Sequence, residues 1–207
     1  MNYLINNFSE IVLLTLNHLY IVFLSTIPAI IFGVIFGIIF SRKKFINFGK
    51  ALLTIFGILQ SIPSIVFISL LFIYTGIGLK TSVIALFLYS IVPIIYNTTS
   101  SLIMVPDEVI DAGRGMGLSK KEILFKIELP LSLKGIFSGI RTSLTINIAT
   151  ATVATVIGVD TLGKIILIGL RVRKMDMLFV GGAIVAILAI FFDLILEKIE
   201  NKILKWT

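Results

Sequence analysis

The sequence predicts an all-α membrane protein with about five transmembrane helices, and three observations support this prediction. Hydrophobic residues make up 57% of the 207 residues and charged residues only 14%, whereas soluble domains carry roughly 25% charged residues. Apolar runs of membrane-crossing length recur along the chain. Charge is concentrated in residues 106–130, here called the polar segment. We therefore expect residues 1–207 to form a single transmembrane domain.

The spans are placed by run length, because about 20 apolar residues cross the hydrocarbon at a rise of about 1.5 Å each. They are expected at about residues 19–40, 51–74, 81–104, 136–157 and 178–196. The second and third contain Pro63 and Pro93. A proline frees backbone groups that protein or a water-filled cavity must satisfy at membrane depth. Both kinks are therefore expected to face the interior.

Polar side chains within the spans indicate an aqueous path. The fourth span mixes threonine and asparagine with alanine, a composition that permits close helix approach and hydrogen bonds between helices. We favour a lining of the path, at a two-fold interface, and helix packing alone is the alternative. The candidate lining residues are Ser61, Pro63, Asn97, Thr145, Asn147 and Thr150.

Basic residues orient the chain. Most of the 18 lysine and arginine residues fall on one side of the membrane if the N-terminus lies outside and the C-terminus inside. By the positive-inside rule that side is cytoplasmic. It holds the bases from Arg42 to Lys50, those of residues 114–141, and Lys198, Lys202 and Lys205. Residues 158–176 are expected to form a short re-entrant or surface helix outside.

The polar segment is expected to begin with a short helix between the third and fourth spans. Pro106 suits the start of this helix because a missing N–H has no partner there in any case. Asp107 and Glu108 in the first turn favour the positive end of the helix dipole. Gly117 is expected to end the helix, since glycine tolerates the left-handed conformation.

A second helix is predicted to open at Ser119 and Glu122, which have the spacing of a capping box. In this motif each side chain accepts a hydrogen bond from the backbone N–H of the other residue. Pro130 makes a regular helix difficult to continue, because its ring removes a donor and clashes with the preceding turn.

Isolated ionisable residues indicate structural roles. Asp193 lies near the inner end of the fifth span, in helical register with Glu197 and Glu200, and is expected to pair with a basic cytoplasmic residue. The single histidine, His18, is expected at the outer interface rather than in a metal site, which needs several ligands. The absence of cysteine excludes disulfides. The net charge of +7 fits cytoplasmic loops and anionic lipid rather than nucleic acid.

The polar segment resembles the EAA loop of ABC importer permeases. Asp111-Ala112-Gly113, Gly117 four residues later, and Ile127-Glu128-Leu129-Pro130 have the spacing of its pattern, with aspartate and glycine replacing a glutamate and an alanine. The runs at residues 60–64, 112–117 and 123–131 are similar to the permease subunits of osmoprotectant importers. Those permeases carry glycine betaine, carnitine, choline or related quaternary amines.

This resemblance implies a type I importer fold like that of the methionine and osmoprotectant permeases, in the plasma or inner membrane. It implies two ATPase subunits, a second permease copy or paralogue, and a separate extracytoplasmic substrate-binding protein. ATP and Mg would bind the ATPase, because this chain lacks the G-x-x-x-x-G-K-[ST] loop and is expected to be neither an enzyme nor a cofactor or metal protein. The expected ATPase contacts are Asp111, Ala112, Gly113, Arg114, Met116, Gly117 and Leu118, and the loop shape is expected to depend on Pro106, Ser119, Glu122, Ile127, Leu129 and Pro130.

Other functions remain open. Related importers of the same plan carry methionine or other small polar solutes. An ion-driven secondary transporter or channel would show coupling-ion sites, buried charge pairs or an inverted repeat. A membrane enzyme needs convergent acids, bases or metal ligands, and the carboxylates outside the polar segment are scattered along the sequence.

Overall fold

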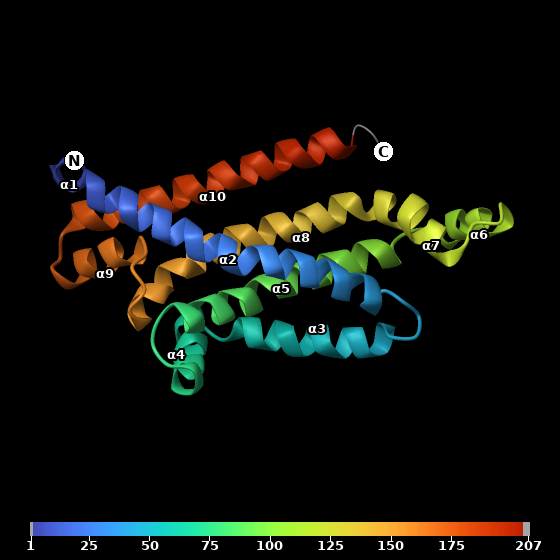
Figure 1. Cartoon of the computed structure of the whole chain (residues 1–207), viewed down its shortest axis with the longest axis horizontal. Helices are drawn as coiled ribbons and strands as arrows, with labels where there is room; N and C mark the ends of the chain where they lie inside the picture. The colour runs from blue at the N-terminus through green and yellow to red at the C-terminus, as the bar shows by residue number, and fades with distance from the viewer. Residues whose placement is uncertain (1, 205–207) are drawn as a thin grey trace.

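The computed structural model describes residues 2–204, which excludes Lys205, and every regular element in them is a helix (Figure 1). This confirms the all-α prediction. The helices are α1 (Asn2–Asn6), α2 (Phe8–Phe40), α3 (Ile46–Ser61), α4 (Ser64–Thr75), α5 (Leu79–Ile103), α6 (Asp107–Gly115), α7 (Lys120–Ile123), α8 (Leu129–Thr150), α9 (Gly163–Arg171) and α10 (Met175–Leu204), with a π-helical turn η1 (Leu124–Glu128) and a 3-10 turn η2 (Ala151–Ile157).

Three of these helices, α2, α5 and α10, are long and apolar enough to cross a membrane by themselves. The predicted second span is instead divided, because α3 ends at Ser61 and α4 starts at Ser64, with Pro63 extended between them (φ −52°, ψ 134°). Proline lacks an N–H and disfavours helix in the residue before it. Pro63 is exposed, which corrects the expectation that it faces the interior, whereas Pro93 is buried within α5.

α5 is the central helix, and a pair of glycines on α2 brings α2 against it. A Cβ on Gly33 would lie 2.8 Å from the Cβ of Ile94, and a Cβ on Gly37 would lie 2.5 Å from the Cβ of Thr98. The two glycines are four residues apart, the spacing that lets two helix backbones approach closely. A residue larger than glycine at either position would therefore push α2 away from α5.

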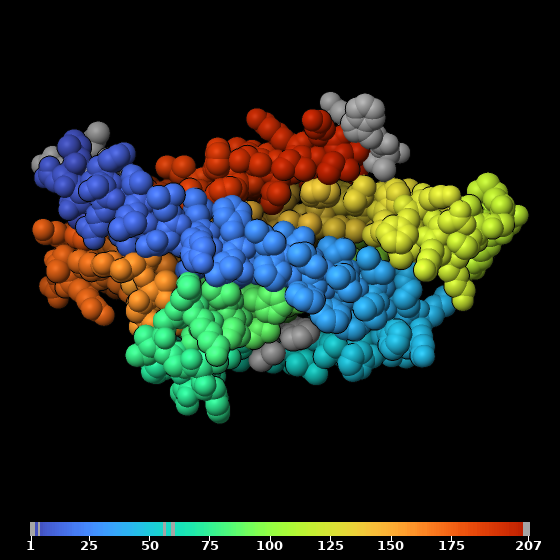
Figure 2. All heavy atoms as spheres, in the orientation of Figure 1, coloured from blue at the N-terminus to red at the C-terminus, as the bar shows by residue number. Residues whose placement is uncertain are grey.

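A second glycine pair brings α8 against another side of α5. A Cβ on Gly139 would lie 2.8 Å from the Cβ of Asn97, and a Cβ on Gly135 would collide with Ser101. α5 is thus held between α2 and α8 by two glycine pairs of the same spacing. In the space-filling view α2 covers much of α5 (Figure 2).

The polar segment and residues 158–176 lie at opposite ends of the long axis of the molecule (Figure 1). α6 and α7 form one end, whereas α1 and α9 lie at the other, and α10 runs back toward the end of α6. α9 is the short helix predicted in residues 158–176, and Arg171 at its end is exposed. The polar segment, predicted to be cytoplasmic, and residues 158–176, predicted to be external, are therefore separated by the length of the long helices.

Candidate functional site

The candidate site begins at α6, the first helix of the polar segment. Pro106 precedes it in an extended conformation (φ −61°, ψ 135°), and Asp107 and Glu108 occupy its first turn. Its end is closed by hydrogen bonds from the Leu118 N–H to the Gly113 carbonyl (3.1 Å) and from the Gly117 N–H to the Arg114 carbonyl (2.9 Å). Gly117 has φ +81°, a conformation that favours glycine.

The capping box of α7 forms as predicted. The Ser119 N–H donates to the Glu122 carboxylate (3.0 Å) and the Glu122 N–H donates to the Ser119 hydroxyl oxygen (3.3 Å). The Lys126 ammonium also donates to Glu122 (2.9 Å). The hydrogen bond from Lys126, followed by those from Ser119, lowers the pKa of Glu122 from 4.5 to about 2. The carboxylate therefore stays charged in mildly acidic solution as well as at neutral pH, and it keeps its hydrogen bonds to the turn.

The second helix continues past Pro130 but not as a regular α-helix, as its position predicts. α7 continues through η1 into α8, and the Leu129 N–H donates to the Leu124 carbonyl, five residues earlier. The helix is irregular just before the proline, as its ring requires, and a wider π turn is a common solution. The polar segment therefore continues without a break into α8, whereas Pro106 separates it from α5.

The predicted ATPase contacts fall into two groups. One group faces solvent and consists of Asp111, Ala112, Arg114, Met116 and Gly117. The other lies inward, because Gly113 is buried, Leu118 is half-buried, and a Cβ on Gly113 would lie 2.6 Å from Cδ1 of Ile127. These inward residues pack α6 against η1. Sequence reasoning missed two exposed apolar residues of the polar segment, Val109 (40% exposed) and Phe125 (66% exposed), which no local motif marks.

An ion pair between Arg42 and Glu128 connects the polar segment to the turn after α2. The Nη1 atom of Arg42 lies 2.8 Å from Oε2 of Glu128, and the Glu128 side chain is only 9% exposed. The Nε atom of Arg42 also donates to the Ile38 carbonyl (3.2 Å). The end of α2 is thereby fixed to η1. Sequence reasoning did not pair these residues, which are 86 positions apart.

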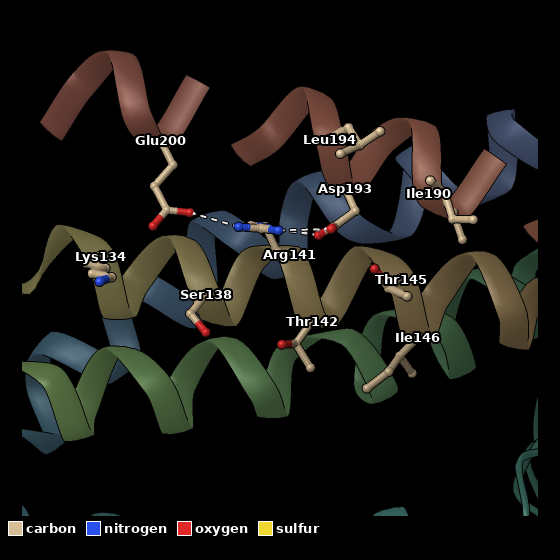
Figure 3. A pocket seen from close by; sticks show the side chains of 11 residues that line it. Lys134, Ser138, Arg141, Thr142, Thr145, Ile146, Ile190, Asp193, Leu194 and Glu200 are labelled. Atoms are coloured by element: carbon tan, nitrogen blue, oxygen red, sulfur yellow. Dashed lines mark hydrogen bonds and ion pairs between the residues drawn. The ribbon is translucent and has the colours of Figure 1, made fainter. Parts of the chain in front are cut away.

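Three carboxylates of α10 converge on Arg141 of α8, and Figure 3 shows two of them, Asp193 and Glu200. The guanidinium donates two hydrogen bonds to Asp193, at 2.8 and 2.9 Å. Glu200 and Glu197 lie 3.2 and 3.4 Å from it. The expectation that Asp193 pairs with a basic residue is confirmed, and two parallel hydrogen bonds give the pair a fixed geometry.

A cavity of about 690 Å³ lies beside this cluster, between α8 and α10. Thr145, a predicted lining residue, borders it, together with Lys134, Ser138 and Thr142 of the same helix (Figure 3). The volume is within the about 300–1,000 Å³ of ligand pockets. Among the other predicted lining residues, Ser61 and Pro63 are exposed at the distant α3–α4 break, while Asn97 and Thr150 are half-buried.

Asn147 was also expected to line the path, but it is fully buried. Its amide donates to the hydroxyl oxygens of Thr26 (2.6 Å) and Ser25 (2.8 Å) on α2. His18, expected at the interface, is likewise fully buried, and its Nε2 lies 3.0 Å from the Ile148 carbonyl of α8. Both side chains connect α2 to α8, because a polar group buried between helices needs a partner there.

Comparisons with known proteins agree with these features. The sequence profile of a family described as "Binding-protein-dependent transport system inner membrane component" matches residues 29–205. The osmoprotectant import permease protein OsmW of Salmonella typhimurium is 35% identical over 204 residues, covering 96% of this chain and 94% of the relative. The glycine betaine/carnitine/choline transport system permease protein OpuCB of Bacillus subtilis is 33% identical, covering 98% and 93%.

Among solved structures, the inward-facing MetNI methionine ABC transporter resembles this chain with a TM-score of 0.81. The match covers 95% of this chain and 97% of the other at 20% identity. A likeness at that identity concerns the fold, and it confirms the predicted importer permease fold.

Proposed function

The chain belongs to the family of binding-protein-dependent transport system inner membrane components, and from this premise we propose that it is the permease subunit of an ATP-driven importer for a quaternary ammonium osmoprotectant. The observation that carries the proposal is the preformed polar segment at one end of the molecule, exposed on its outer surface and continuous with α8. A partner protein can bind such a projection, and a movement of the projection then displaces α8, with which it is continuous.

The partners that fit this arrangement are two ATPase subunits at the polar segment, which would hold ATP and Mg. A second copy of the permease, or a paralogue, would lie beside the first in the membrane and enclose the path with it. A separate binding protein would deliver the solute at the opposite end, where α9 lies. In this proposal the chain is a multi-pass plasma or inner membrane protein with the polar segment in the cytoplasm.

The direction of force follows from the connections of the polar segment. Movement of α7 passes through η1 into α8 because that helix has no break, and movement of α6 reaches η1 because Gly113 packs against Ile127. The same movement reaches the end of α2 through the Arg42–Glu128 pair. Since α8 also carries Arg141 and the polar side chains beside the cavity, the ATPase would displace the wall of the path directly.

The exposed stripe of α8 supports its place along the path. Lys134, Ser138, Thr142 and Thr145 follow one another at helical spacings and are all exposed beside the cavity. Hydroxyl groups on such a stripe replace the water around a small polar solute without binding it tightly. The stripe of a single chain forms only part of an enclosed path, and the second permease would supply the remainder.

The solute class is supported by relatives such as OsmW and OpuCB, which are named for osmoprotectants and align with nearly the whole chain. The methionine alternative is supported by a likeness of fold at 20% identity. A quaternary ammonium group donates no N–H hydrogen bond, so proteins select it with aromatic faces. We place that selection mainly in the binding protein.

The proposal is tested by uptake into cells that express the permease with its ATPase and binding protein. Radiolabelled glycine betaine, carnitine, choline and methionine are compared, with either ATP or the proton gradient removed. We expect saturable uptake of a quaternary amine that stops on ATP depletion and persists without the proton gradient. Uptake of methionine alone would contradict the solute, and uptake that follows the proton gradient would contradict the importer class.

A further inference from the structure

An apolar groove of about 720 Å³ lies between α2, α3 and α5, beside the turn that joins α2 to α3. Its lining, here called the aromatic groove, contains Phe36, Phe40, Phe45, Phe48 and Phe87 together with aliphatic side chains of the same helices. The groove is open on one side, since Phe48 is 60% exposed and Phe45 is 41% exposed. An exposed apolar patch of this kind indicates a binding surface.

Ring contacts hold the walls of the groove in place. Phe40 stacks on Phe36 with 6.0 Å between ring centroids and meets the edge of Phe48 at 6.0 Å. Such aromatic pairs add roughly 0.5–1.5 kcal/mol each beyond their buried area. The start of α3 is also held against Phe40, because a Cβ on Gly49 would lie 2.6 Å from the Phe40 Cβ. The groove is therefore preformed.

Exposed lysines are close in sequence to Phe45 and Phe48, which border the groove. Lys43, Lys44 and Lys50 lie in or just after the α2–α3 turn, and none of the ion pairs in residues 2–204 involves them. The sequence has no acidic residue between Glu10 and Asp107, so no nearby carboxylate along this part of the chain offsets their charge.

One contact connects this charge to the apolar lining. The Nζ atom of Lys44 lies 5.5 Å from the centre of the Phe45 ring, and Phe45 borders the groove. This is the range of a cation–π interaction. A ligand with an anionic head and an apolar tail would thus meet both features within a few ångströms.

We propose that the aromatic groove binds an acyl chain of an anionic glycerophospholipid whose phosphate lies against Lys43, Lys44 and Lys50. A soluble anion would leave the aromatic side chains without a partner, and a zwitterionic lipid would bring its own cation toward the lysines. A second copy of this chain would place the same lysines against each other in a two-fold contact. The inference requires that the chain lies in a membrane, and it does not depend on which solute is carried.

The test uses a tryptophan reporter in the groove and lipids with brominated acyl chains, which quench nearby tryptophan. Phe48→Trp is introduced together with Trp206→Phe, because the chain contains one tryptophan. The full chain is reconstituted in mixtures of brominated and plain phosphatidylglycerol and phosphatidylcholine. We expect phosphatidylglycerol to be preferred by at least about tenfold at low salt, since three lysines at about 1 kcal/mol each set an upper limit of roughly a hundredfold.

Two controls separate the site from general attraction to lipid. The variant Lys43→Gln/Lys44→Gln/Lys50→Gln should reduce the preference to about unity, with unchanged quenching by phosphatidylcholine showing that the groove still folds. Lys80→Gln removes an exposed lysine at the start of α5 and should leave the preference unchanged. An Ile27→Trp reporter, on an exposed part of α2 away from the groove, should show no preference.

Three results would overturn the proposal: equal quenching by the two lipids, a preference that survives the triple lysine variant, or no quenching by any lipid at Phe48→Trp. The last result would mean that protein occupies the groove. Uptake measured on the same variants keeps this result separate from the transport proposal, because a failed lipid preference with intact uptake would refute only the lipid site.

Discussion

Gly117 holds the backbone conformation on which the shape of the polar segment depends. A β-branched residue at φ +81° is strained by about 1–3 kcal/mol, and this strain would open the turn between α6 and α7. We expect Gly117→Val to reduce solute uptake severalfold while the chain still inserts into the membrane. Uptake and the amount of chain in the membrane fraction are measured together.

Gly115 provides the matched control for this variant. It ends α6, and a Cβ there would meet nothing within 4 Å. Gly115→Ala should therefore leave uptake unchanged. Equal loss in both variants would show that the left-handed turn has no special role in the coupling.

Asn147 and Thr145 distinguish helix packing from path lining within one helix. Asn147→Ala leaves the hydroxyls of Ser25 and Thr26 without their donor, at a cost of about 1–3 kcal/mol. We expect it to lower the unfolding temperature, whereas Thr145→Val, on the cavity wall, should change the KM for the solute at an unchanged unfolding temperature. The placement of the path would be refuted if Thr145→Val lowered the unfolding temperature and Asn147→Ala changed only the KM.

The Glu122 carboxyl has a lowered pKa of about 2 in the folded chain. A group with a lowered pKa stabilises the fold fully above its ordinary pKa, here 4.5, and this contribution is lost as pH falls through about 2. We expect hydrogen exchange at the Ser119 amide, corrected for its intrinsic rate, to be equally slow at pH 5 and pH 7. Glu122→Gln should accelerate it at both values.

Residue-level features of the polar segment were predictable because their causes are local. A helix start at Pro106, a left-handed stop at Gly117 and the capping box of Ser119 and Glu122 each depend on a few neighbouring residues. The burial of His18 and the Arg42–Glu128 pair were not predictable in this way. Their partners lie 130 and 86 positions away, so only the packed fold brings them together.

At the scale of elements, the unbroken helix from α7 through η1 to α8 is the main connection between the polar segment and the spans. The Arg42–Glu128 pair is the second connection. If this pair transmits force, Arg42→Glu should reduce uptake, because a carboxylate would then face Glu128 near the protein interior. The double variant Arg42→Glu/Glu128→Arg should restore a substantial part of it.

The charge exchange is also expected to change the amount of ATP hydrolysed per solute transported, a ratio that a purely structural role of the pair would leave unchanged. We expect the single variant to raise ATP hydrolysis per solute transported in the assembled importer, and the double variant to lower it again. A single variant that loses uptake and ATP hydrolysis in the same proportion would indicate a folding defect rather than lost coupling.

Element boundaries were partly predictable. The glycine pairs on α2 and α8 can be read from the sequence as small residues four positions apart, although their common partner α5 cannot. The break at Pro63 has a local cause, but run length alone joined α3 to α4 in one predicted span. The π turn before Pro130 arises from continuing a helix past a proline, which only the packing of α8 makes favourable.

At the scale of the whole molecule, the two ends of the long axis carry different segments. The polar segment forms one end and α9 the other, with α2, α5, α8 and α10 between them (Figure 1). The Arg141 cluster is a charge pair of the kind that ion-coupled transporters also use. The Arg141 cluster borders the cavity, and Arg141 lies on α8, the helix that continues from the polar segment. This arrangement supports a path whose wall is moved from the polar segment.

The central claim is that an ATPase grips the polar segment from the cytoplasm, and cross-linking from single cysteines tests it most directly, because the natural chain contains no cysteine. Met116, 73% exposed on the polar segment, and Leu170, 63% exposed on α9, are changed separately to cysteine in the assembled importer. Met116→Cys should cross-link to the ATPase in a nucleotide-dependent manner and resist impermeant thiol reagents added outside intact cells, whereas Leu170→Cys should show the opposite pattern. Labelling of Met116→Cys from outside, with no cross-link to an ATPase, would contradict the account.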